Sequence, residues 1–177
     1  CGQASLPENA GPWVNTLGTP LLSLAGINND YMLGSLIYRD DVDVATNNGV
    51  YTGTNTGGVL ADPTPCGNWT LSNASSADSA LIHFGSSLGG ATRGCNLGDA
   101  LLCLQTGPGA PLPNIDRTSA RDPKTVFVTT QTGTGNLSTW PQAGGQTGIA
   151  AGHNICRDLA SSAGLANANS YKAWLSS

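Results

Sequence analysis

The sequence offers few side chains that could catalyse a reaction. Histidine occurs only twice, at His83 and His153, and only 10% of the residues are charged. General acid–base and nucleophilic catalysis need an acid, a base and a nucleophile gathered in one place. His153 lies near Arg157 and Asp158 on a predicted helix, but no nucleophile-elbow motif accompanies it. We therefore interpret His153 as a helix-surface residue and His83 as an ordinary strand residue, and we expect a protein that is not an enzyme.

The densest group of hard oxygen ligands is Asp40, Asp41 and Asp43, with Asn47 and Asn48 close behind. Calcium takes six to eight oxygen ligands, and an irregular loop of this composition supplies several of them. The spacing lacks the terminal Glu and the sixth-position Gly of an EF-hand. A solvated turn explains the same cluster, and we favour it over a Ca²⁺ site. Apart from this calcium alternative, no cofactor is expected.

The five cysteines, Cys1, Cys66, Cys95, Cys103 and Cys156, are widely spaced and form no C-x-x-C pair. A zinc site built on cysteine is therefore disfavoured. In an acidic, lysine-poor chain this pattern predicts two disulfides and one cysteine left over. Cys1 has three interpretations: a lipid-modified N-terminal cysteine, a partner in an intermolecular disulfide, or a free thiol.

Composition limits the partners further. The chain has 177 residues, which is enough for one domain with a sizeable core. Seven Lys and Arg residues spread over the whole length form no phosphate-tracking patch, so nucleic-acid binding is disfavoured. The longest apolar runs are about five residues, too short for a membrane span. A surface rich in Gly, Ser, Thr and Asn fits an extracellular or cell-surface protein.

The first hundred residues have turn signals about every eight residues, which is typical of short strands. We predict strands at residues 33–38, 50–54, 80–84 and 100–105. The last of these is apolar on both faces, which places it in the centre of a sheet. Residues 106–123 contain a Gly/Pro-rich run that favours an extended linker.

The remainder of the chain carries the clearest local signals. Residues 124–130 are β-branched and predict a strand. Residues 149–163 predict a helix, with Ala151, Ile155 and Leu159 along its buried face and Gly164 as its left-handed C-cap. A second short helix is predicted at 170–175.

Two blocks of motifs are similar to a known module. The first block comprises VFVT at 126–129, GNL at 135–137, HNIC at 153–156, AGL at 163–165 and YKAWLS at 171–176. It resembles the opening half of a bacterial extracellular module that has a C-type-lectin-like (endostatin-like) fold and occurs in surface lipoproteins and large secreted proteins. The second block comprises GPWV at 11–14, YTGTN at 51–55, CGNWT at 66–70, Cys95, and LCL at 102–104. It resembles the closing half of the same module.

The order of the two halves is reversed relative to that family. The resemblance implies a closing half at 1–105, a linker at 106–123 and an opening half, a strand plus two helices, at 124–177. It also implies the disulfides Cys66–Cys95 and Cys103–Cys156. The expected fold is α+β and C-type-lectin-like, with an irregular antiparallel sheet, two helices and stabilising disulfides.

Two connectivities satisfy this arrangement. Either the linker closes the module within one chain, as a circular permutant, or residues 124–177 of one subunit complete residues 1–105 of the next, head to tail. Shortening the linker to about four residues is expected to strain closure within one chain and to alter or block the spacing between subunits in a fibre.

We therefore expect a structural module, either a subunit or a tandem repeat of a surface fibre assembled from copies of itself. The alternative is an adhesin-like module that binds a glycan or a host protein through the loops around 40–60 and 131–147. For that alternative, Trp140, followed by Pro141 in a polar loop, is the candidate exposed contact residue. Trp69 and Trp174 are expected in the core.

Overall fold

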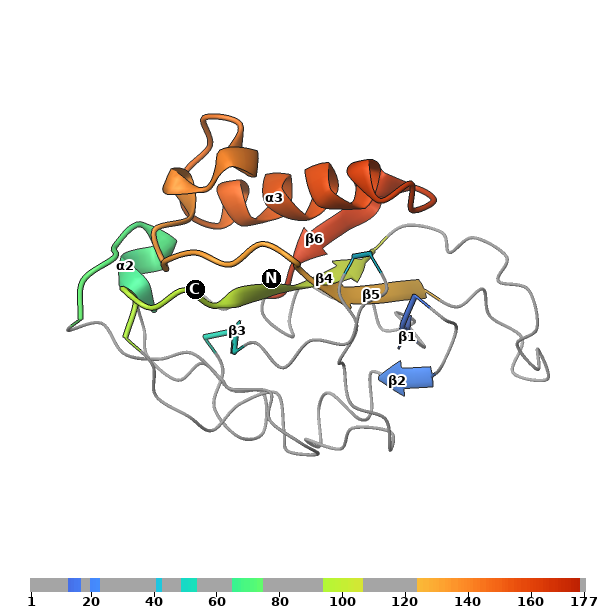
Figure 1. Ribbon diagram of the computed structural model, residues 1–177, viewed down its shortest axis with the longest axis horizontal. Helices are drawn as coiled ribbons and strands as arrows, with labels where there is room; N and C mark the ends of the chain where they lie inside the picture. The colour runs from blue at the N-terminus through green and yellow to red at the C-terminus, as the bar shows by residue number, and fades with distance from the viewer. Residues whose placement is uncertain are drawn as a thin grey trace.

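A long helix packs across one side of a mixed sheet (Figure 1). The computed structural model describes residues 13–16, 20–22, 41–42, 49–53, 65–74, 94–106 and 124–175. The strands expected at 33–38 and 80–84, most of the linker, and the residues Cys1, Asp40 and Asp43 lie outside the described residues.

The described elements follow one another in a simple order. The strands are β1 (Trp13–Val14), β2 (Pro20–Leu22), β3 (Val50–Tyr51), β4 (Ala100–Gln105), β5 (Lys124–Val128) and β6 (Tyr171–Ala173). The helices are the single turn α2 (Cys66–Trp69) and the long helix α3 (Gly148–Ser162). Short 3-10 turns occur at Leu137–Thr139, Pro141–Ala143 and Ala168–Ser170.

The sheet has the strand order β2-β1-β5-β4-β3, and β6 also pairs with β4. β3 pairs with the start of β4 and β6 with its end, while β5 pairs along it antiparallel. The β1–β5 and β3–β4 pairs are parallel. The expected α+β class is confirmed, but the expectation of an antiparallel sheet is wrong. Long connections lead from β1 to β5 and from β3 to β4, so the chain has room to return in the parallel direction.

Strand β4 occupies the central position that its apolar sequence predicts. All six of its residues are buried. Leu101 and Cys103 belong to the core cluster beneath α3. Leu102 and Leu104, which alternate with them along the strand, are buried as well. Both faces of the sheet are therefore covered at β4.

Helix α3 begins one residue before and ends one residue before the predicted range. Its buried side carries Ala151, Ile155 and Leu159, as its periodicity predicts. Gly164 has a φ of 69°, and the amide of Leu165 donates to the carbonyl of Ala160 over 2.9 Å. This is the Schellman arrangement, in which a left-handed residue lets the chain turn back and satisfy the last carbonyls.

The second helix, predicted at 170–175, is wrong. Residues 171–173 form β6, which pairs antiparallel with the end of β4. Tyr171 and Ala173 are buried and Lys172 between them is half-buried, so burial follows the period of a strand. The reason is tertiary: β6 supplies hydrogen-bond partners to an edge of β4 that a helix would leave unpaired.

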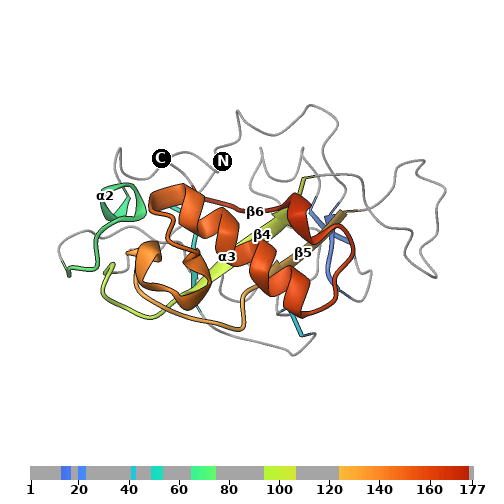
Figure 2. The same ribbon diagram turned by 90° about the horizontal axis from the view of Figure 1, so that it is seen from above.

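Helix α3 approaches β6 closely because residue 152 is glycine. A Cβ atom at Gly152 would lie 2.8 Å from Cδ1 of Leu175 and 3.1 Å from Cβ of Ala173. Seen from above, α3 crosses over β4, β5 and β6 (Figure 2). No helix among the described residues is both long enough and apolar enough to cross a membrane.

Candidate functional site

The interface between residues 1–105, here the first half, and residues 124–177, here the second half, is the candidate site. Strand β5 of the second half lies between β1 and β4, which both belong to the first half. Strand β6 of the second half also pairs with β4. Among the described strands, each strand of the second half therefore pairs only with strands of the first half.

The register across this interface places apolar side chains opposite one another. Leu102 pairs with Val128, Cys103 with Phe127 and Leu104 with Val126. All six residues are at most 2% exposed. The contact between the halves is therefore part of the buried core, like the interior of a single domain.

Gln105 holds three segments together at the edge of this core. Its Oε1 accepts a 3.0 Å hydrogen bond from the amide of Thr125, and its carbonyl accepts one of 3.1 Å from Nε1 of Trp13. Its Nε2 donates to the carbonyl of Ala166. Gln105 is 1% exposed, so the two bonds of its side chain and the one of its carbonyl replace hydrogen bonds to water that burial removes. Sequence reasoning missed this role; the only signal was a polar residue at the end of an apolar strand.

The Cys103–Cys156 disulfide joins the two halves covalently. Cys103 lies on β4 and Cys156 on α3, with their Cα atoms 5.6 Å apart. The second disulfide, Cys66–Cys95, lies within the first half and has the same Cα separation. These are the two pairs that the lectin-like resemblance implies. They also fit the expectation of two disulfides and one further cysteine.

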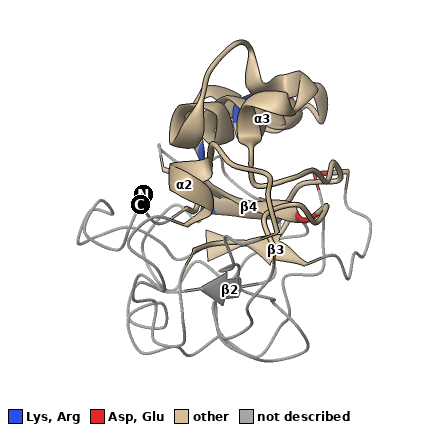
Figure 3. Cartoon of the chain, turned by 90° about the vertical axis from the view of Figure 1, so that its left-hand side faces the viewer, with Lys and Arg blue, Asp and Glu red and all other residues tan. Residues whose placement is uncertain are grey.

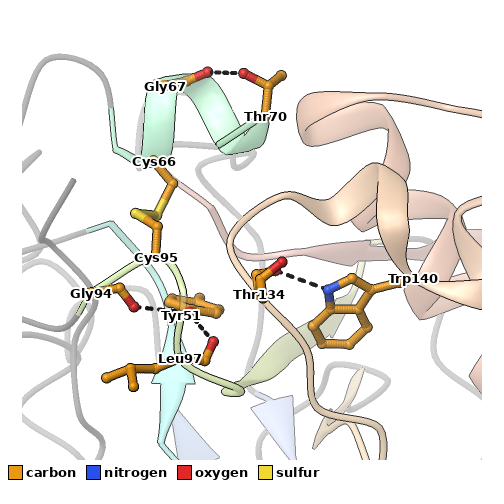
Figure 4. The surroundings of a disulfide bond; sticks show 9 residues. All are labelled: Tyr51, Cys66, Gly67, Thr70, Gly94, Cys95, Leu97, Thr134 and Trp140. Atoms are coloured by element: carbon orange, nitrogen blue, oxygen red, sulfur yellow. Dashed lines mark hydrogen bonds between the residues drawn. A yellow bond between two sulfur atoms is a disulfide. The ribbon is translucent and has the colours of Figure 1, made fainter. Parts of the chain in front are cut away.

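An unusual turn leads into the Cys66–Cys95 disulfide (Figure 4). All four residues of α2, Cys66, Gly67, Asn68 and Trp69, have φ between 46° and 65°. The turn is thus left-handed, which costs roughly 1–2 kcal/mol for each residue other than glycine. The disulfide and the fully buried Trp69 hold it in place.

The second half packs directly against this disulfide through Gly135. The amide of Gly135 donates to the carbonyl of Cys95 over 2.8 Å. A Cβ atom at Gly135 would lie 2.5 Å from Sγ of Cys66, so no larger residue fits without rearrangement. Near Cys95, the hydroxyl of Tyr51 donates a hydrogen bond to the carbonyl of Leu97 (Figure 4).

Asp41 also connects the two halves. Its Oδ1 accepts a 2.6 Å hydrogen bond from the amide of Thr130, and its Oδ2 accepts one of 3.2 Å from the Thr130 hydroxyl. The carboxylate is buried, so the favoured interpretation of a solvated turn is wrong for this residue. Asp40 and Asp43 lie outside the described residues. Within the described ranges, no group of three or more His, Cys, Asp or Glu side chains is placed to hold a metal.

Trp140 is not an exposed contact residue, contrary to expectation. It is 5% exposed, and its Nε1 donates to the carbonyl of Thr134 over 2.9 Å. The 3-10 turns on either side of it fold the indole back onto Gly133, where a Cβ atom would lie 2.5 Å from Nε1. Trp69 and Trp174 lie in the core, as predicted.

His153 is half-buried on α3 rather than fully on the surface. Burial lowers its pKa to about 4, and the positive charges of Lys172 and Arg157 add to the effect. The ring is therefore neutral at neutral pH.

Comparison with known proteins adds no relative. No family model, no curated protein and no solved structure matches the chain. The lectin-like resemblance therefore rests on the sequence motifs.

Proposed function

We propose that this chain is a non-enzymatic extracellular structural module whose two halves complete one another between subunits. In this proposal the module is C-type-lectin-like. The second half of each subunit fills the first half of the next, and repetition of this contact builds a surface fibre. A heterologous contact of this kind does not close on itself, so it propagates.

The observation that carries the proposal is the position of β5. Without the second half, β1–β2 and β3–β4 remain as two separate strand pairs with the position between β1 and β4 vacant. Such a gap is a binding site for an incoming strand, which gains main-chain hydrogen bonds along both edges and side-chain pockets on both faces. A strand supplied by a neighbouring copy makes the same contacts as one supplied by the chain itself.

The linker is long enough for the second half of one subunit to reach the first half of another. Leu104 lies opposite Val126, and Gln105 is hydrogen-bonded to Thr125, so the ends of β4 and β5 are adjacent. Closing this antiparallel pair within one chain needs only a turn of two to five residues. Residues 106–123, fully extended, reach about 60 Å. The expectation that a four-residue linker strains closure is therefore wrong.

The chemistry of the interface fits a permanent assembly. Obligate interfaces resemble a domain core cut in two, and this one is apolar and fully buried. In the exchanged arrangement, the Cys103–Cys156 disulfide links one subunit to the next. That linkage would make the fibre resistant to dissociation outside the cell, where disulfides persist.

Replacing the linker tests the proposal. In the tight-turn variant, Asn-Gly replaces residues 107–123, which permits a two-residue hairpin and only closure within one chain. In the matched control, a Gly/Ser sequence of equal length replaces the same residues. We expect the wild type and the control to form open-ended assemblies and the tight-turn variant to be a monomer, as measured by sedimentation velocity.

A wild type that is monomeric at every concentration would contradict the proposal. The adhesin-like binding module would then replace it as the better account of the chain.

A further inference from the structure

A polar depression lies on the outer side of α3. Asn154, Arg157, Asp158 and Ser161 line it from the helix, and Asn169 lines it from the turn that follows. The four helix residues are spaced at i, i+3, i+4 and i+7, which places them on one face. The depression is open to solvent and has a volume of about 310 Å³, and all five lining side chains carry hydrogen-bonding groups.

The Nε donor of Arg157 has no hydrogen-bond acceptor in the part of the chain that the structure describes. This Nε atom is buried. The guanidinium is always charged, and a buried donor without an acceptor is costly. In a chain with only seven Lys and Arg residues, an arginine that lines a depression is a candidate ligand-binding group. The cartoon is coloured for Lys and Arg at α3 and just beneath it (Figure 3).

The neighbouring groups are oriented for hydroxyl recognition. Asn154 donates from Nδ2 to the carbonyl of Gln142 over 3.0 Å, which fixes the orientation of its amide. Asp158 and Asn169 are exposed at the rim and bring further acceptors and donors. The site thus combines one planar cation with several neutral or acceptor groups, and the surface that lines it is mostly polar.

We propose that this depression binds a carboxylate-bearing saccharide, such as a hexuronic acid unit of an extracellular polymer. Arg157 pairs with the carboxylate through two parallel N–H···O bonds, which is the geometry that guanidinium favours. Asn154, Asp158 and Asn169 bind the ring hydroxyls. The volume is at the lower end of the range for small-molecule sites and suits a single pyranose ring. The site is separate from the interface between the halves and does not depend on the proposed assembly.

Titration of isotope-labelled protein with glucuronate, followed by NMR, tests the proposal. Glucose supplies the hydroxyls without the carboxylate, and acetate supplies the carboxylate without the hydroxyls. We expect saturable shifts at Asn154 and Asn169 with glucuronate, at least tenfold tighter than with either fragment. For a chain that assembles, the tight-turn linker variant provides a form suited to solution NMR.

Substitutions at the site complete the test. R157A should weaken glucuronate binding at least tenfold, and R157K should weaken it less, because lysine keeps the charge but not the planar pair of donors. N169A removes a second group that lines the depression and should also weaken glucuronate binding. The control is S162A, at an exposed position of the same helix outside the depression, which should bind glucuronate as the wild type does. The absence of saturable shifts, equal affinity for acetate, or unchanged binding by R157A would overturn the proposal.

Discussion

Removing the Cys103–Cys156 disulfide should both destabilise the protein and show which chains it joins. For a cross-link within one chain, a sequence separation of 53 residues corresponds to about 4 kcal/mol of stabilisation through restriction of the unfolded chain. Both cysteines are fully buried, so alanine is the appropriate replacement, since it places no new polar group in the core. The variant is C103A/C156A.

If the assembly is as proposed, the stability of C103A/C156A should also depend on protein concentration, which the loss of a cross-link within one chain does not predict. Without the covalent link, an exchanged second half is held by non-covalent contacts alone, and its binding follows mass action. A hundredfold increase in protein concentration should then raise the apparent free energy of unfolding by about 2.7 kcal/mol. Urea denaturation followed by tryptophan fluorescence, at concentrations spanning that range, measures the effect.

The other disulfide provides the matched control. Cys66 and Cys95 both lie in the first half, 29 residues apart, so C66A/C95A should cost about 3.5 kcal/mol in either connectivity. It should leave the dependence on concentration as it is in the wild type.

Two results would refute this reasoning. A C103A/C156A midpoint that is independent of concentration would refute exchange between subunits. A loss of stability below about 1 kcal/mol would refute the assigned role of the cross-link.

Three further predictions concern single residues. Between pH 7 and pH 4.5, protonation of His153 should lower the free energy of unfolding by about 1–2 kcal/mol, a figure reduced for the partial exposure of the ring. Urea denaturation measures this loss, and H153Q should remove it. The sign follows because the pKa of His153, about 4 when folded, lies below its ordinary value of 6.5, so the unfolded chain takes up the proton first and stability is lost as the pH falls through that window. G152V should cost about 1–3 kcal/mol by overpacking α3 against β6, whereas A150V on the exposed side of the same helix should cost less than about 1 kcal/mol in the same assay. D41A should cost about 1.5–3 kcal/mol by leaving Thr130 without its acceptor, and millimolar Ca²⁺ should leave the wild-type melting temperature unchanged; a rise would reinstate the metal site.

The elements that sequence predicts well are those with strong local signals. The apolar run of β4 and the 3.6-residue period of α3 each determine their own structure, and Gly164 ends the helix through a backbone preference. The four residues of α2 have no comparable signal. Their left-handed turn depends on a disulfide partner 29 residues away and on the burial of Trp69.

The incorrect predictions share a tertiary cause. Tyr171 and Trp174 are spaced as on a helix, but the open edge of β4 makes that segment a strand. Trp140 lies in a polar sequence, but two 3-10 turns fold it inward. A local pattern does not reveal which edge or surface of the fold needs to be covered.

The site was predictable only in part. The cysteine pairs follow from the motif resemblance, and the structure contains both. The bonds of Gln105 and Asp41 did not follow, because each partner lies 20 or more residues away and no motif marks it. Contacts of this kind depend on the register of strands that come together only in the folded sheet.

Isotope-resolved mapping of the Cys103–Cys156 disulfide tests the central claim most directly. Equal amounts of unlabelled and ¹⁵N-labelled reduced chains are refolded and oxidised together, digested without reduction and analysed by mass spectrometry. The account predicts that about half of the Cys103–Cys156 disulfides link one labelled and one unlabelled peptide, as random pairing between chains requires. Cys66–Cys95 pairs, formed within the first half, should remain isotopically uniform. Cys103–Cys156 pairs that are all uniform would contradict the account, because each chain would then have closed on itself.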